Sequence, residues 1–204
     1  MIPGRGVAIP DQMKHLPVDR RGYPIFFGAL IGKDGTPFFT INDERKRAAM
    51  IDRDLCSVCG KKLFRFRWFA GGPASAFHER GCYIDMPMHD DCVHFALRIC
   101  PYLAAPRYLR DIGERQADAA RVKSDHFITI DPTMIPDRPE VFIAVLARGQ
   151  KMVRGDGYQD YVRPKRPYLK VEHWRHGRML TADEVAALPL DQQGIGSTRE
   201  RRRA

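Results

Sequence analysis

The sequence predicts an α+β fold, with a small N-terminal domain followed by a mainly β C-terminal region. Apolar strand-like runs alternate with short amphipathic helical segments along the 204 residues. The 17 glycines and 15 prolines favour many short elements joined by turns over a helical bundle. A hydrophobic fraction of 44% is enough for one sizeable core or two small ones.

Three regions divide the chain. We place the N-terminal domain at residues 1–120, the mainly β region at residues 121–193 and a tail at residues 194–204. The boundary falls in Gly113–Lys123, whose Ala, Arg, Asp and Glu residues predict a solvated helix or linker. The tail has no apolar periodicity and a dense positive charge, so we expect it to be disordered.

Two elements are predicted before the first cysteine. Tyr23–Ile41 contains two apolar runs around Asp34-Gly35, the pattern of a β-hairpin with a tight turn. Asp43–Asp54 has helical spacing, and Asn42 or Asp43 can cap its first turn.

The middle of the chain predicts two strands and a helix. Leu63–Phe69 alternates, which predicts a half-buried strand with Phe64, Phe66 and Trp68 on one face. A second strand is predicted at Phe77–Ile84 after a Gly-Gly-Pro break. A helix over Met88–Ile99 follows Pro87, and we expect it to end near the next proline.

The C-terminal half reads mainly as β-structure. Strand-like runs occupy His126–Ile130, Val141–Ala147 and Tyr168–Trp174, and His176-Gly177 predicts a turn. Thr181–Glu184 matches a capping box at the start of a final short helix.

Positive charge is concentrated in the C-terminal third. The formal net charge is +9, and Tyr161–Arg178 carries six basic side chains against Glu172 alone. Such clusters attract phosphates, and aromatic side chains among them can stack on bases. The simpler interpretation is the solvated outer face of a strand. The candidate nucleic-acid contacts are Arg163, Lys165, Arg166, Lys170, Arg175 and Arg178, with Tyr168 and Trp174 for stacking.

No segment has the length of a membrane span. The longest apolar stretches, Ile25–Gly32 and Val141–Ala147, are far shorter than the roughly 20 residues that a bilayer-spanning helix needs. The N-terminal residues also lack the apolar core of a signal peptide. We therefore expect a cytoplasmic protein without membrane contact.

Two cysteine-containing pairs have the spacing of metal ligands. Cys56 and Cys59 form a Cys-x-x-Cys turn, and Gly60 directly after it allows the backbone to turn toward sulfur. His89 and Cys92 lie three residues apart at the start of the predicted helix, so both side chains can reach one ion. Zinc prefers four such ligands at tetrahedral corners. The sequence therefore predicts one structural zinc ion in a treble-clef-like finger.

Other nearby residues leave the ligand set open. His78, Cys82, His94 or Cys100 could replace His89. The first two of these residues could also serve a second ion. Cys100 lies about two helical turns beyond Cys92, which favours a place in the core.

The N-terminal half resembles an uncharacterised family of zinc-finger-like proteins of treble-clef type from bacteria and phages. The similarity covers about residues 16–106 and rests on His15–Pro24, Asp34-Gly35, Leu55–Gly60, Pro87–Cys92 and Cys100–Leu103. This resemblance implies metal binding and a phage or bacterial origin, with the host cytoplasm as location, but no reaction. It also makes Cys100 part of the shared pattern.

Three functions are compatible with these features. The first is a non-enzymatic, zinc-stabilised protein that contacts nucleic acid through the basic C-terminal third. The second is a phage-encoded module that binds a host protein or enzyme. The third, a metal-dependent nuclease, is disfavoured, because the paired His and Asn expected around such a finger are missing and His89 is committed to zinc. Glu172, His173 and His176 could form a separate cluster, but strand alternation separates their faces.

Overall fold

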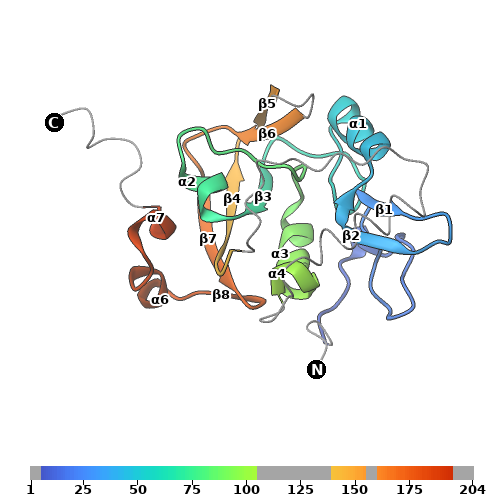
Figure 1. The fold of residues 1–204 in the computed structure, drawn as a ribbon, viewed down its shortest axis with the longest axis horizontal. Coiled ribbons are helices and arrows are strands. Elements are labelled where there is room, and N and C mark those ends of the chain that lie inside the picture. Colours follow the sequence, from blue (N-terminus) through green and yellow to red (C-terminus); the bar gives the residue numbers. More distant parts are fainter. Residues whose placement is uncertain (1–5, 105–138, 155–159, 195–204) are drawn as a thin grey trace.

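The computed structural model describes residues 6–104, 139–154 and 160–194 (Figure 1). Within these ranges the chain forms both helices and strands, consistent with the predicted α+β fold. The predicted linker Gly113–Lys123, the strand His126–Ile130 and the tail beyond Gly194 lie outside the described residues. No helix of the described part is both long and apolar enough to cross a bilayer.

A four-stranded antiparallel sheet forms the centre of the protein. Its strand order is β3 (Arg67–Gly71), β4 (Phe142–Ala147), β7 (Lys170–Arg175) and β8 (Arg178–Met179). In β4, Val145 pairs with Phe69 of β3. Strands from both sides of the predicted linker therefore share one sheet.

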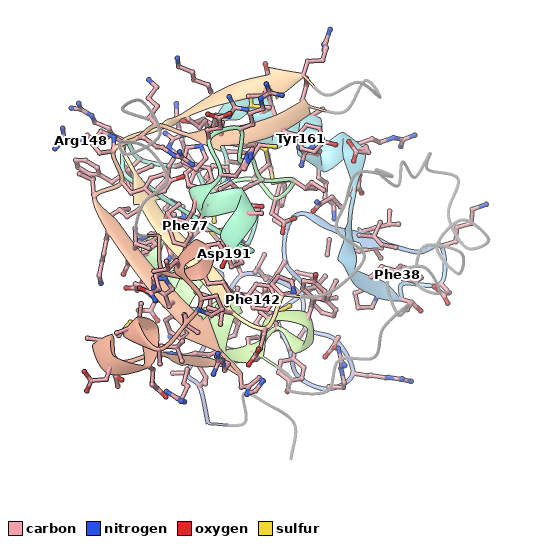
Figure 2. The ribbon with its side chains drawn as sticks, turned by 60° about the vertical axis from the view of Figure 1, so that its left-hand side comes forward. Phe38, Phe77, Phe142, Arg148, Tyr161 and Asp191 are labelled. Atoms are coloured by element: carbon pink, nitrogen blue, oxygen red, sulfur yellow. The ribbon has the colours of Figure 1, made fainter. Side chains whose placement is uncertain are left out.

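Both faces of this sheet are covered. Alternation in β4 sends Phe142 into one cluster, with α3 (Asp90–Ile99) and α4 (Pro101–Ala104), and Ile143 into another, with α2 (Pro73–Phe77). Figure 2 shows Phe77 of α2 beside Asp191 of α7 (Leu190–Gln193), and these two helices are in contact. Because the sheet is covered on both sides at its centre, β4 is continuously apolar, whereas β7 and β8 also carry polar and charged residues.

The N-terminal hairpin and helix are confirmed. β1 (Ala29–Ile31) pairs antiparallel with β2 (Pro37–Asn42) across the predicted turn. In α1 (Glu44–Arg53) the Asp43 carboxylate accepts hydrogen bonds from the two backbone N–H groups of residues 45 and 46, at 3.0 and 3.3 Å. Both elements carried strong local signals in a turn residue and a cap.

The predicted strand over Leu63–Phe69 is wrong in its start and its buried face. β3 begins only at Arg67, and the side chains of Phe64 and Phe66 are 75% and 53% exposed. Trp68 and its neighbour in sequence are both buried, because the sheet is covered on both faces. An alternating pattern predicts one buried face, and this strand has two.

The predicted second strand at Phe77–Ile84 is also wrong. Helix α2 starts at Pro73 and ends at Phe77, and the segment after it forms one isolated bridge, between Tyr83 and Val162. Proline at the first helical position is favourable, since its fixed φ suits the helix and its missing N–H has no partner there.

The C-terminal region matches its prediction in part. The strands expected at Val141–Ala147 and Tyr168–Trp174 are confirmed as β4 and β7. The capping box before α6 (Ala182–Ala186) is present, with both of its reciprocal hydrogen bonds. The hairpin of β5 (Gln150–Arg154) and β6 (Asp160–Pro164) was not predicted.

Candidate metal centre

A tight backbone turn presents the first cysteine pair. The N–H of Gly60 donates to the carbonyl of Cys56 at 2.9 Å, and the N–H of Cys56 donates to the carbonyl of Lys61 at 2.8 Å. Gly60 has a φ of +71°, and a Cβ there would lie 2.7 Å from the ring of Phe27. This position therefore needs glycine for two reasons, backbone conformation and close packing.

The second ligand pair, His89 and Cys92, is positioned next to the cysteine turn by a backbone bridge at the edge of the sheet. Met88 exchanges two backbone hydrogen bonds with Trp68 of β3, at 2.8 and 2.9 Å. This bridge places His89 at the N-cap of α3 and Cys92 in its first turn. A strand and a helix end therefore hold the two side chains next to the cysteine turn.

The four predicted residues form one buried cluster. Each offers one ligand atom, and these atoms all lie within 4.8 Å of one another. Cys56, Cys59 and Cys92 have no exposed surface, and His89 is buried. In a tetrahedral zinc site with Zn–S bonds of about 2.3 Å, sulfur atoms lie about 3.8 Å apart. The donor set and its spacing are compatible with one structural metal ion.

Hydrogen bonding orients the histidine ring. Its Nε2 atom lies 3.0 Å from the carbonyl oxygen of Lys62, and its Nδ1 atom lies 3.3 Å from the sulfur of Cys59. A carbonyl only accepts, so Nε2 must donate to it. In the neutral ring this leaves the lone pair of Nδ1 directed at the cluster, the usual arrangement of a metal-binding histidine with an oriented second nitrogen.

The electrostatics of the cluster are compatible with a bound cation. Burial opposes a charge on Cys56, yet hydrogen bonds from Cys59, Cys92 and His89 hold the pKa of its thiol well below the usual range. Hydrogen bonding to the Cys56 sulfur raises the pKa of the other two thiols and of the imidazole. By themselves the residues thus favour one thiolate, and a bound cation would also stabilise the other two as thiolates.

The alternative ligands lie elsewhere. His94 has Nδ1 at 2.9 Å from the Asp90 carbonyl and Nε2 at 2.8 Å from Glu172, and His78 accepts from a backbone N–H at 3.1 Å. Cys82 and Cys100 are partly exposed and outside the cluster. Among the residues that the structure describes, the Cys₃His cluster is the only group of this kind.

Several of the predicted nucleic-acid contacts hold the fold together. Arg163 donates to the carbonyls of residues 80 and 81, and Arg166 donates to those of residues 76 and 78 at 2.8 and 2.7 Å. The hydroxyl of Tyr168 also donates to the carbonyl of residue 76, at 2.8 Å. These side chains tie the β6–β7 segment to the last turn of α2 and the backbone after it.

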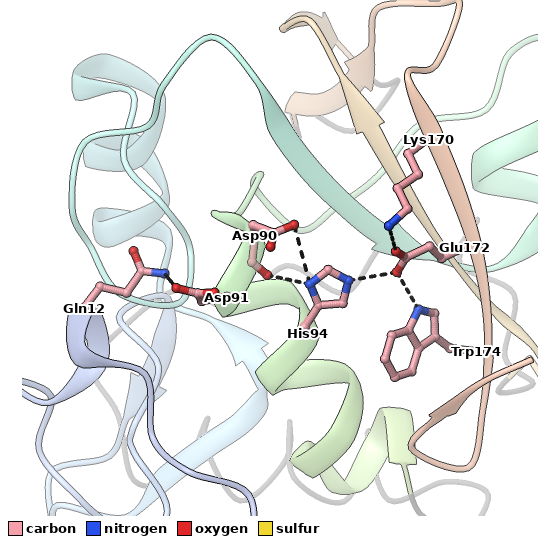
Figure 3. Close-up of polar contacts among 7 residues, drawn as sticks. All are labelled: Gln12, Asp90, Asp91, His94, Lys170, Glu172 and Trp174. Atoms are coloured by element: carbon pink, nitrogen blue, oxygen red, sulfur yellow. Dashed lines mark hydrogen bonds and ion pairs between the residues drawn. The ribbon is translucent and has the colours of Figure 1, made fainter.

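All but Lys165 of the remaining predicted contacts also have intramolecular side-chain partners. Lys170 and Trp174 both contact the buried carboxylate of Glu172, at 2.6 and 3.0 Å (Figure 3). Trp174 is only 3% exposed and lies in the core, so neither face of its indole can stack on a base. Arg175 pairs with Glu140 and Arg178 with Glu184. Lys165 is exposed.

The unpredicted β5–β6 hairpin brings two basic residues that the sequence analysis missed, Arg148 and Lys151, next to the predicted contacts Arg163 and Lys165. Lys151 of β5 lies directly opposite Arg163 of β6, and Arg148 and Lys165 are exposed at the same end of the hairpin. Figure 2 shows Arg148 on the side of the molecule where these strands lie. Residues 148–154 contain three basic side chains, and that local charge was the available signal.

Comparisons with protein families, with curated proteins and with solved structures each found no match.

Proposed function

We propose that this chain is a non-enzymatic, zinc-stabilised binding protein that contacts nucleic acid through the basic surface of its C-terminal third. The buried Cys₃His cluster is the observation that carries this proposal. Four protein donors would complete a tetrahedron and leave no position for an activated water, which favours a structural metal over a catalytic one.

The donor chemistry favours zinc. Thiolates and imidazole in a tetrahedral set suit Zn²⁺, whereas Mg²⁺ and Ca²⁺ prefer oxygen ligands. The order of a cysteine turn, a strand bridge and a helix that starts at the second ligand pair supports a treble-clef finger. The resemblance to zinc-finger-like bacterial and phage proteins is consistent with this assignment.

Two basic residues at paired positions of the β5–β6 hairpin support the nucleic-acid part of the proposal. Lys151 and Arg163 occupy paired positions of β5 and β6, where like charges are destabilising, although the Arg163 guanidinium also donates to the carbonyls of residues 80 and 81. Arg148 and Lys165 add exposed positive charge nearby. A phosphate backbone along this hairpin would relieve the repulsion.

Metal analysis tests the zinc assignment. We expect about one zinc per chain, and Cys92→Ser should lower metal content and unfold the N-terminal half, because binding energy at such sites is folding energy. Cys100→Ser is the matched control and should keep its zinc. A folded wild-type protein without metal, or Cys92→Ser with full metal content, contradicts the assignment.

Salt-dependent binding tests the nucleic-acid contact. We expect affinity for duplex or single-stranded DNA to fall steeply with salt, and Lys151→Gln with Lys165→Gln should flatten the slope by up to about two units. Arg20→Gln with Arg45→Gln removes the same charge from exposed sites elsewhere and should leave the slope unchanged. No binding at low salt would discard this contact in favour of a protein partner.

A further inference from the structure

Two phenylalanines are exposed beside the candidate metal centre. Phe64 and Phe66 lie between the cysteine turn and β3 and are 75% and 53% exposed. Burying such a side chain is worth about 1.5–3 kcal/mol, so the fold leaves two large apolar groups without that stabilisation. Adjacent exposed aromatics of this kind commonly mark a contact surface.

The loop that carries these rings, residues 61–66, is firmly held. The N–H of Leu63 donates to the Asp54 carbonyl at 2.8 Å. The buried guanidinium of Arg67 donates to the carbonyl of Phe64 at 2.8 Å and to the Asp54 carboxylate at 3.0 Å. The Phe64 ring lies 5.8 Å from the ring of His89. The rings are thus presented by an ordered backbone.

The same loop is strongly basic. Lys61, Lys62 and Arg65 are exposed, and residues 61–69 contain no acidic side chain. The guanidinium of Arg65 lies 6.0 Å from the centre of the Phe66 ring. Exposed cations interleaved with exposed aromatic rings suit a ligand that has both negative charges and flat π-faces.

The loop also adjoins the basic hairpin. Arg67 contacts both the Phe64 carbonyl and the side-chain oxygen of Gln150, the latter at 3.3 Å. Gln150 is the first residue of β5 and precedes Lys151. The Arg67 side chain therefore connects the loop directly to the β5–β6 hairpin, which carries Lys151 opposite Arg163.

We propose that residues 61–66 form a base-stacking site for single-stranded nucleic acid, with Phe64 and Phe66 as stacking rings and Lys61, Lys62 and Arg65 as phosphate contacts. This inference rests on the proposed nucleic-acid function and specifies the form of the ligand. In a duplex the base faces are already stacked, and only a single strand offers them to a protein ring. An apolar protein groove would bury the rings but leave three cations without partners.

The test separates base stacking on the two phenylalanines from electrostatic attraction of the phosphates. The probes are an oligothymidylate of about 12 nucleotides and an abasic strand of equal length. Phe64→Leu with Phe66→Leu should weaken binding of oligothymidylate about tenfold or more with an unchanged salt slope, whereas Phe64→Tyr with Phe66→Tyr should bind like wild type. The abasic strand should bind weakly to all three proteins. Unchanged metal content verifies that the variants are folded.

A fluorescent variant gives a direct readout. Both native tryptophans are only 3% exposed, so an indole introduced by Phe66→Trp should dominate any change in emission when a strand binds. We expect quenching by oligothymidylate and none by the abasic strand.

Two results would overturn the inference. One is a leucine variant that binds as tightly as wild type with a normal salt slope, which would leave the proposed function intact and place the contact elsewhere. The other is equal affinity for the abasic strand. Failure of wild-type protein to bind any nucleic acid would instead remove the proposed function together with this site.

Discussion

The Nε2 atom of His94 in α3 lies 2.8 Å from the Oε2 atom of Glu172 in β7, a contact between residues 78 positions apart (Figure 3). Lys170 and Trp174 donate to the same carboxylate. Burial raises the pKa of Glu172, but hydrogen bonds from these three partners outweigh it and lower the pKa below its usual range. A buried, charged carboxylate thus fastens α3, the helix of the candidate metal centre, to the sheet.

Replacing this carboxylate should destabilise the protein. We expect Glu172→Gln to lower the free energy of unfolding by about 1–3 kcal/mol, because its three donors, of which Trp174 is buried, lose a charged acceptor. Glu140→Gln is the control, since this 69% exposed partner of Arg175 should contribute less than about 1 kcal/mol. Chemical denaturation with metal present measures both values, and equal losses would contradict the prediction.

The cysteines outside the cluster should be replaceable. We expect Cys82→Ala and Cys100→Ala each to keep full metal content and to cost about 1 kcal/mol of stability, as for a small packing residue. Cys59→Ala should lose the metal. Cobalt substitution gives the measurement, because thiolate-to-cobalt bands report the number of sulfur ligands. A weakened thiolate band in Cys82→Ala would assign that residue to the ligand set.

Stability should decrease on mild acidification. His173 is buried, and its Nε2 lies 2.9 Å from the carbonyl of Gln192. Burial lowers its pKa despite that hydrogen bond, so the unfolded chain takes up the proton more readily. The free energy of unfolding should therefore fall as pH drops below about 6.5.

A variant isolates this effect from metal loss. Thermal unfolding at about pH 7.5 and about pH 5.5 should show a smaller decrease in His173→Gln than in wild type, with metal content followed at both values. An identical decrease in the two proteins would exclude His173 as the source.

Gly60 should tolerate no side chain. In Gly60→Ala the alanine would have to adopt a φ of +71°, which is strained for it, and its Cβ would lie 2.7 Å from the Phe27 ring. We therefore expect the free energy of unfolding to fall by several kcal/mol and metal binding to weaken. Gly35→Ala has a similar φ of +77° in open space and should cost only about 1 kcal/mol. The difference between their unfolding free energies measures the ring contact, and no difference would mean that Phe27 simply moves aside.

Local signals in the sequence predicted the parts of the fold that depend on neighbours along the chain. The cap at Asp43, the box at Thr181–Glu184 and the Cys56/Cys59 turn each require only a few adjacent residues. The pairing of these cysteines with His89 and Cys92 was also predictable, since ligand spacing and a helix start coincide there.

Long-range pairing accounts for what the sequence did not reveal. Phe64 and Phe66 alternate as in a strand, but β3 forms only where β4 is available to pair, from Arg67 onward. Arg166 looked like a free cation, yet its partners are backbone carbonyls some 90 residues away, at Ala76 and His78. Neither composition nor hydrophobic periodicity can predict a hydrogen bond to a backbone carbonyl so far away in the sequence.

The position of β3 between the two ligand pairs bears on the order in which parts of the chain can fold during synthesis. During synthesis Cys92 emerges well before Phe142, so the Cys₃His cluster can form while the partner strand β4 does not yet exist. The closed cluster would fix the Trp68–Met88 bridge and so keep the outer edge of β3 covered. The nascent chain would then hold β3 in place, and β4 could pair with it as soon as it is synthesised, before β7 and β8 are added.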